Sequence, residues 1–175
     1  MANLWVFAYG SLMWDTFFPF EERLPAKLYG YHRAYCIYSW HYRGTEQRPG
    51  LVLGLDRGGS CRGIVFRLPR DNGREILQRI DERELVTSVY HARNLNLYLD
   101  SGHKVMARCY IADPTHRQYA GRLTLHEQQQ LITNGQGVGG HNLDYFKSTQ
   151  QHLFQEGIED RGLKKLADHF QKRPN

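Results

Sequence analysis

The chain has 175 residues, of which 41% are hydrophobic and 13% aromatic, a composition typical of a globular protein rather than a disordered one. No run of about 18 apolar residues occurs, so the sequence predicts no transmembrane helix and no membrane partner. The first residues lack the basic and apolar pattern of a signal peptide, and we therefore expect no export.

The formal net charge of +5 suits either nucleic acid or an anionic small molecule as a partner. The three cysteines, Cys36, Cys61 and Cys109, are odd in number and far apart. This pattern argues against a disulfide framework and a CxxC metal site, and it favours a cytoplasmic location. The histidines lack a ligand spacing such as HExxH, and neither GxSxG nor a P-loop motif occurs, so no metal, serine-triad or NTPase site is predicted.

Near the start of the chain, residues 5–8 predict a strand because they are bulky and uncharged. Tyr9, Gly10 and Ser11 then predict a tight turn. Glycine permits a backbone turn that most residues resist and lets a ligand approach the main chain, and the amides of such a turn can converge on an anion. The segment therefore suits a small charged ligand, although a turn with no function fits the same pattern.

Further strands are expected at residues 27–40, as one strand or two, after a loop at residues 15–25. The turn residues 56–59 predict a hairpin between residues 51–55 and 61–68, and Ser101-Gly102 predicts another between residues 89–99 and 105–111. Such strands indicate an α+β fold with an antiparallel sheet, open or closed. Because no repeat or linker is present, we expect residues 1–175 to form a single domain.

Helical spacing predicts four helices. The first covers residues 74–84, with Asn72 as a candidate cap. Thr124 and Glu127 form a capping box for a second helix that ends near residue 134. A third covers residues 142–156, with Phe154 on its apolar stripe, and a short fourth helix precedes a polar tail from about residue 171.

Glu84 is the strongest candidate for an acid–base group. Counting by four, it shares a helix face with Ile76 and Ile80, and desolvation on that face would raise its pKa. The negative end of the helix dipole acts in the same direction. A carboxyl with a pKa closer to neutrality suits general acid–base catalysis. The alternative is a helix-end carboxylate that only pairs with Arg83 or Arg93.

The glycine-rich residues 135–140 contain a formal GxGxxG pattern. A helix rather than a strand is predicted before it, which argues against a dinucleotide site. The loop suits either close approach to a substrate or simple separation of two helices. Tyr145, on the helix that follows and off its apolar stripe, can present its hydroxyl to a site or be an ordinary exposed tyrosine.

Aromatic and basic residues also alternate between positions 29 and 43. Such a stretch can stack on and neutralise RNA. An ordinary strand with its aromatic side in the core fits the same pattern, and we therefore expect no nucleic-acid partner.

Taken together, these segments resemble the ChaC-type γ-glutamylcyclotransferases. The matching segments are residues 6–14, 42–44, 49–55, 81–84 leading to Tyr90, and 140–145. The resemblance implies a small mixed or antiparallel β-barrel flanked by helices. It also implies cleavage of glutathione, the small-molecule substrate, to 5-oxoproline and Cys-Gly without metal or cofactor. Ala8 and Ser88 depart from the family pattern, where glycine is common, which bears on substrate preference.

The resemblance places the catalytic carboxylate at Glu84 and the substrate-binding turn at the end of the first strand. The candidate substrate-binding residues are Val6, Phe7, Ala8, Tyr9, Gly10, Ser11, Leu12 and, on the later helix, Tyr145. Attack of the γ-glutamyl amine on its own γ-carbonyl closes a five-membered ring, which one carboxyl can assist by moving both protons. Two alternatives stay open: a cyclotransferase for other γ-glutamyl amino acids or amines, and a non-catalytic RNA-binding or regulatory module.

Overall fold

The structure is a computed structural model that describes residues 3–172. Five strands close into a barrel in the order β1-β3-β2-β4-β5. Their bounds are β1 (Trp5–Ala8), β2 (Glu22–Ser39), β3 (Gly50–Arg67), β4 (Tyr90–Leu99) and β5 (Lys104–Ala112). β1 pairs parallel with β5 and antiparallel with β3, while β4 pairs antiparallel with β2 and β5. The predicted α+β fold with a small mixed barrel is therefore confirmed.

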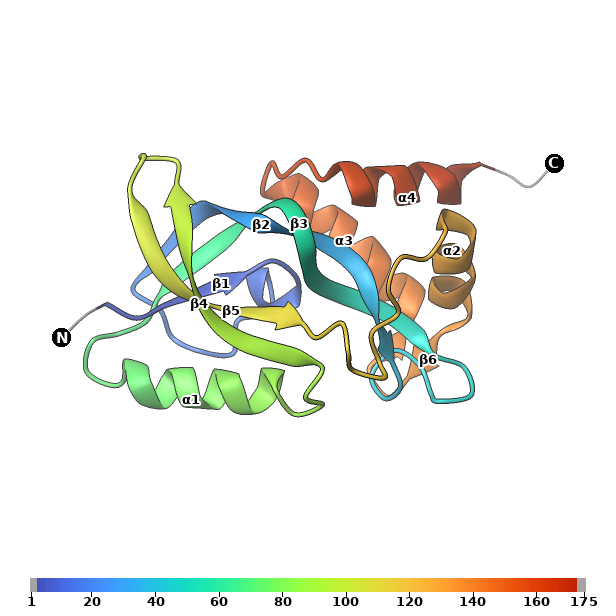
Figure 1. Ribbon diagram of the computed structural model, residues 1–175, viewed down its shortest axis with the longest axis horizontal. Coiled ribbons are helices and arrows are strands. Elements are labelled where there is room, and N and C mark those ends of the chain that lie inside the picture. The colour runs from blue at the N-terminus through green and yellow to red at the C-terminus, as the bar shows by residue number, and fades with distance from the viewer. Residues whose placement is uncertain (1–2, 173–175) are drawn as a thin grey trace. The chain divides into compact units, whose positions relative to one another are not determined.

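Four α-helices accompany the barrel strands (Figure 1). They are α1 (Gly73–Glu84), α2 (Leu125–Asn134), α3 (Asn142–Gln155) and α4 (Arg161–Gln171). The capping box at the start of α2 is present, with Thr124 accepting from the Glu127 amide. Asn72 holds the N-cap position of α1, but its side chain makes no capping hydrogen bond. None of the helices within residues 3–172 combines the length and hydropathy that a membrane crossing requires.

The chain divides into two compact units, residues 1–32 with 55–113 and residues 33–54 with 114–175. The first contains β1, α1, β4 and β5, and the second contains the helices α2, α3 and α4. A single domain over residues 1–175 stays a prediction. The expected polar tail lies, from residue 173 on, outside the described residues.

The hairpin expected around residues 56–59 is wrong, because β3 continues through them as one strand. Gly58 and Gly59 have positive φ angles of 96° and 68°. Two residues in this left-handed region can bend a strand or form a bulge without reversing it. The glycine pair thus marks an irregular point in the strand rather than its end.

Two further expectations need correction. β2 begins at Glu22, inside the segment predicted as a loop, and runs unbroken to Ser39. Phe154, expected on the apolar stripe of its helix, is 86% exposed. It lies in the last turn of α3, where helical periodicity predicts a side chain's direction but not whether a neighbour covers it.

Candidate active site

The strand that leads to the predicted turn is buried over its last three residues. Val6, Phe7 and Ala8 pair with Phe66, Val65 and Ile64 of β3, and all three are at most 1% exposed. These three residues therefore expose neither side chain nor backbone to solvent. β1 forms part of the core that supports the turn after it.

The turn after β1 is a short 3₁₀ helix, η1 (Ser11–Met13). The Met13 amide donates to the Gly10 carbonyl at 2.9 Å, and the Asp15 amide donates to the Ser11 carbonyl at 2.7 Å. The first amides of a helix have no carbonyl partner inside it, which leaves the N–H groups of Ser11 and Leu12 as donors for a ligand. Gly10 has a φ of −134°, so the turn does not use the left-handed backbone that glycine permits.

Tyr110 on β5 connects this turn region to α1. The Tyr9 hydroxyl donates to the Tyr110 carbonyl oxygen at 3.0 Å, and the Tyr110 hydroxyl donates to Asp81 Oδ1 at 2.7 Å. Arg108 Nη2 lies 3.4 Å from Asp81 Oδ2. Burial, with the neighbouring Asp81 carboxylate, raises the pKa of Tyr110 far above its ordinary value. Tyr110 is therefore a neutral hydrogen-bond donor at physiological pH.

Glu84 is the last residue of α1, and its side chain is only 22% exposed. The buried Ile76 and Ile80 confirm the predicted apolar face. Burial raises the pKa of the Glu84 carboxyl, and the positive charge of Arg83 partly opposes that rise. Arg83 Nε lies 3.9 Å from Glu84 Oε1, the outer limit of an ion pair. The geometry thus supplies a carboxyl of raised pKa that is not held in a tight ion pair.

The helix that carries Glu84 and the turn region are linked through the same tyrosine, which bonds to Asp81 of α1. The charge of Glu84 contributes to the raised pKa of Tyr110, whose carbonyl holds the Tyr9 hydroxyl. Sequence reasoning did not single out Tyr110, Arg108 or Asp81, which the structure joins to one another between α1 and the turn region. Helical spacing directs Asp81 away from the apolar face of α1, and the only signal for Tyr110 is its position in a predicted strand.

Tyr145 lies in the other compact unit, on α3. Its ring makes an edge contact with Tyr35, with centroids 6.2 Å apart, and the Arg43 guanidinium lies 5.4 Å from its centroid. Arg43 also donates to the Gly139 carbonyl. Tyr145 is thus half-buried and packed, which contradicts the alternative of an ordinary exposed tyrosine.

The glycine-rich loop forms a small hairpin of β6 (Gln136–Gly137) and β7 (Gly140–His141). The amides of Val138 and Gly139 donate to the carbonyls of His41 and Tyr42, at 2.9 and 2.8 Å. A Cβ at Gly137 would overlap the His41 carbonyl oxygen. The glycine here permits close approach of two backbone segments, and α2 rather than a strand precedes it, as predicted.

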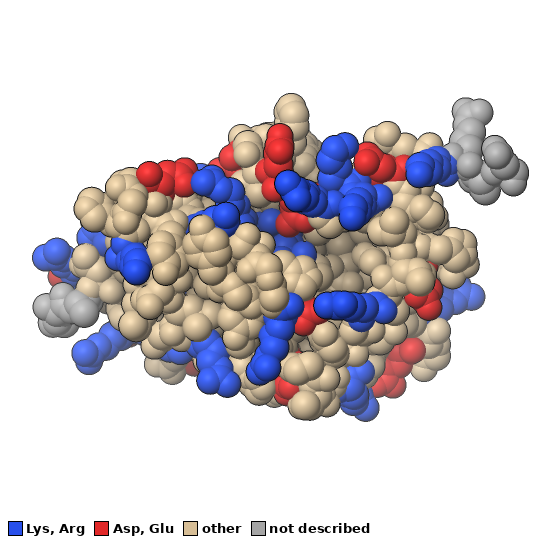
Figure 2. Space-filling view, turned by 45° about the horizontal axis from the view of Figure 1, so that its top comes forward, with Lys and Arg blue, Asp and Glu red and all other residues tan. Residues whose placement is uncertain are grey.

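The aromatic and basic stretch at residues 29–43 contributes to the core. Tyr35 is 3% exposed. The fully buried Arg33 side chain pairs with Asp160 at 2.9 Å. On the face shown in Figure 2, Lys and Arg side chains occupy several separate places with Asp and Glu among them. These observations favour the interpretation of an ordinary strand for residues 29–39, while residues 40–43 lie beyond the end of β2.

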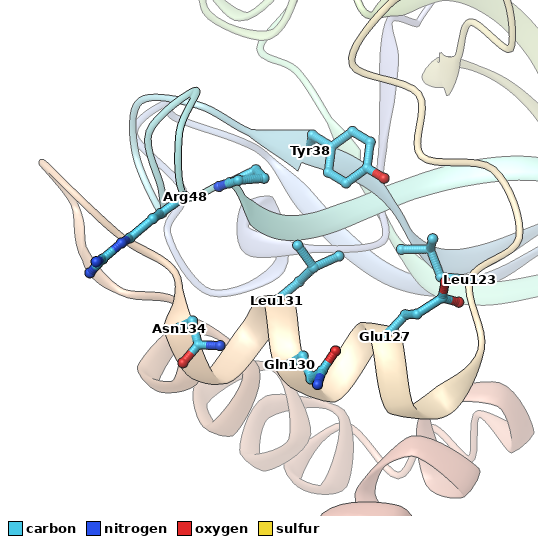
Figure 3. Close-up of a pocket in the computed structure, with 8 residues that line it drawn as sticks. Tyr38, Arg48, Leu123, Glu127, Gln130, Leu131 and Asn134 are labelled. Carbon is cyan, nitrogen blue, oxygen red and sulfur yellow. The ribbon is translucent and has the colours of Figure 1, made fainter.

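A pocket of about 360 Å³ lies in the second unit, between α2 and the segment that includes Arg48 (Figure 3). Its lining residues are Tyr38, Arg48, Pro49, Leu123, Glu127, Gln130, Leu131 and Asn134. None of them is a predicted site residue. Glu127, its one carboxylate, belongs to the capping box of α2, whose hydrogen bonds lower its pKa. The pocket therefore lacks a carboxyl of raised pKa.

A model of the ChaC-like protein family matches residues 4–173. This chain belongs to the ChaC-like family. Its relatives include the glutathione-specific γ-glutamylcyclotransferase of Escherichia coli, which is 36% identical over 97% of this chain and 73% of that protein. Another is γ-glutamylcyclotransferase 2-3 of Arabidopsis thaliana, 31% identical over 94% of this chain and 87% of that protein.

Solved structures agree with the fold of this ChaC-like chain. The crystal structure of a γ-glutamylcyclotransferase specific to glutathione from yeast superimposes with a TM-score of 0.86. The two share 21% identity over 96% of this chain and 95% of that one. At this identity the likeness establishes the shared fold.

Proposed function

We propose that this protein is a γ-glutamylcyclotransferase that cleaves glutathione to 5-oxoproline and Cys-Gly. Membership of the ChaC-like family and the relative of that activity in Escherichia coli support this substrate. The observation that carries the proposal is the half-buried Glu84 carboxyl of raised pKa at the end of α1, a helix that Tyr110 connects through Asp81 to the turn that follows β1. A protein of the same fold without an acid–base group there would lack the means to move the protons.

Glu84 is the proposed general acid and base. The α-amine of the γ-glutamyl group attacks its own γ-carbonyl carbon, and a five-membered lactam closes as the bond to the cysteinyl nitrogen breaks. Glu84 first accepts a proton from the α-ammonium and then returns one to the departing amine. A carboxyl with a pKa closer to neutrality performs both transfers better than one at its ordinary value.

The turn after β1 is the proposed binding site for the γ-glutamyl group. The amides of Ser11 and Leu12 suit an anionic oxygen, either the α-carboxylate or the carbonyl oxygen that becomes negative during attack. Val6, Phe7 and Ala8, each at most 1% exposed, are proposed to act by supporting the turn from the core. Tyr9 and Gly10 shape the turn, and Tyr145 is proposed as a further substrate-binding residue.

Much of the rate enhancement is expected to come from holding the substrate folded. Both reacting groups belong to one molecule, so a site that fixes their approach removes orientational entropy from the barrier. The net charge of +5 favours an anionic peptide. We also propose a cytoplasmic location, supported by the three cysteines Cys36, Cys61 and Cys109, which are odd in number and far apart in the sequence.

The test is incubation of the purified protein with glutathione and detection of 5-oxoproline and Cys-Gly. Parallel reactions with γ-glutamyl-alanine address the alternative of other γ-glutamyl substrates, a comparison prompted by the broader name of the Arabidopsis relative. Equal kcat/KM for both would contradict glutathione specificity. Absence of 5-oxoproline from both substrates would contradict the proposed reaction.

A further inference from the structure

The side chain of Arg83 connects three features of the first unit. Its Nη2 lies 3.3 Å from Asp15 Oδ2, and its guanidinium carbon lies 4.4 Å from the centroid of the Phe17 ring. Its Nε lies 3.9 Å from Glu84 Oε1. One side chain at the end of α1 thus contacts both the segment that follows η1 and the adjacent carboxyl.

Asp15 and Phe17, the residues that Arg83 contacts, are themselves held in place. The Asp15 amide donates to the Ser11 carbonyl at 2.7 Å, so Asp15 continues the turn directly. Phe17 makes an edge contact with Phe18, which makes another with the fully buried Phe66, each at 5.6 Å between centroids. Arg83 therefore rests against a segment that is anchored to the turn at one end and to the barrel core at the other.

We propose that Arg83 is a positioning residue of the cyclotransferase reaction, which fastens the end of α1 carrying Glu84 to the segment that continues the Ser11–Met13 turn. The inference rests on the proposed function. Because Glu84 directly follows Arg83, fixing the arginine also fixes the backbone that presents the carboxyl. A displacement of about 1 Å between a catalytic group and its substrate can slow a reaction by about 100-fold.

The contacts of Arg83 affect the position of Glu84 more than the stability of the fold. Its side chain is 41% exposed and that of Asp15 is 65% exposed, and exposed ion pairs contribute little to stability. A neutral residue at position 83 is therefore expected to leave the fold intact. Loss of the Arg83 contacts should then lower kcat, because catalysis depends on the position of the Glu84 carboxyl.

The charge of Arg83 is divided between two carboxylates, which provides a second readout. The charged and titratable groups around Glu84 are Arg83 on α1, Asp15 beyond it, and Tyr110 with its partners Asp81 and Arg108. Arg83 lowers the pKa of Glu84, so its removal should raise that pKa. Removal of the Asp15 carboxylate takes away a competing negative charge beside Arg83. The arginine should then stabilise the Glu84 carboxylate more strongly and lower the pKa of Glu84.

The test compares Arg83→Gln, Arg83→Lys and Asp15→Asn by steady-state kinetics with glutathione across pH. We expect Arg83→Gln to lower kcat by about 10- to 100-fold with a smaller change in KM, and to move the acid limb of kcat/KM to higher pH. Asp15→Asn should move that limb to lower pH. Arg83→Lys should restore the limb, because it keeps the charge, but recover kcat only in part, since lysine lacks the planar group that stacks on Phe17.

Arg62→Gln is the matched control, since Arg62 forms an exposed ion pair with Asp100 at 2.9 Å on the barrel. It should behave as wild type. Wild-type kcat and acid limb in Arg83→Gln would overturn the inference while the proposed function stands. Absence of 5-oxoproline formation by the wild-type protein would instead overturn the proposed function. If Arg83→Gln fails to fold by circular dichroism, wild-type kcat in Arg83→Lys together with an unshifted acid limb in Asp15→Asn would overturn the inference.

Discussion

The Tyr110 hydroxyl donates to Asp81 Oδ1 at 2.7 Å. Asp81 lies on α1, three residues before Glu84. The carbonyl of the same tyrosine accepts from the Tyr9 hydroxyl at 3.0 Å. One residue of β5 therefore contacts both the helix that carries the candidate acid and the residue that opens the substrate turn. We expect the placement of the two candidate site elements to depend on this shared contact.

Tyr110→Phe removes the hydroxyl and keeps the ring. The partly buried Asp81 carboxylate then loses a donor, which costs about 1–3 kcal/mol, so we expect a lower Tm and a lower kcat. Thermal unfolding and 5-oxoproline formation measure the two effects. Tyr98→Phe on the exposed face of β4 is the control. Unchanged Tm and kcat in Tyr110→Phe would show that the hydrogen bond is dispensable.

Glu84→Gln is expected to fold as wild type but to form 5-oxoproline at least about 100-fold more slowly, because the amide can neither accept nor return a proton. The assay is product formation from glutathione at saturating concentration. Glu82→Gln changes an exposed carboxylate two residues away and should keep full activity. Near-wild-type turnover by Glu84→Gln would remove this carboxyl from the mechanism.

Burial of Glu84 also has a consequence for stability. A carboxyl whose pKa is raised on folding favours the folded state below its unfolded pKa, and that contribution is lost as the pH rises through the folded value. Glutamine has no charge to bury. We therefore compare the Tm of Glu84→Gln with that of wild type between about pH 4, near the ordinary carboxyl pKa, and pH 8. The Tm of the variant minus the Tm of wild type should increase as the pH rises. A Tm difference that stays constant across this range would contradict the raised pKa.

Ser11→Ala tests the turn after β1. Alanine keeps the Ser11 amide and removes only the hydroxyl. We propose that this hydroxyl makes one further hydrogen bond to the γ-glutamyl group, whose loss should lower kcat/KM about tenfold. Ser101→Ala, at the exposed hairpin between β4 and β5, should leave kcat/KM unchanged. Wild-type kcat/KM in Ser11→Ala would confine the Ser11 hydroxyl to a structural role.

Ser88 has a φ of 58° and is the one non-glycine residue with positive φ among residues 3–172. A side chain in this left-handed region costs about 1 kcal/mol, which explains why glycine suits the position. We therefore expect Ser88→Gly to raise the free energy of unfolding by up to about 1 kcal/mol, less the entropy that glycine gains in the unfolded chain. Urea denaturation measures the free energy of unfolding. A lower value in Ser88→Gly than in wild type would contradict backbone strain at Ser88.

The sequence by itself determined the local features of this protein. Periodicity placed Glu84 on the buried face of a helix with Ile80, and the Thr124–Glu127 capping box marked the start of α2, because both patterns depend on neighbours a few residues away. The motifs and their order along the chain were sufficient to indicate the family.

Only the tertiary structure decided which distant residues meet. Tyr110 lies 29 residues from Asp81 and 101 from Tyr9, and Arg83 lies 68 residues from Asp15. Such contacts follow from how strands pair and a helix packs, which local pattern does not encode. For the same reason Gly58 and Gly59 suggested a hairpin. A glycine pair permits reversal or bending equally, and the continuous strand β3, which lies between β1 and β2 in the barrel, selected bending.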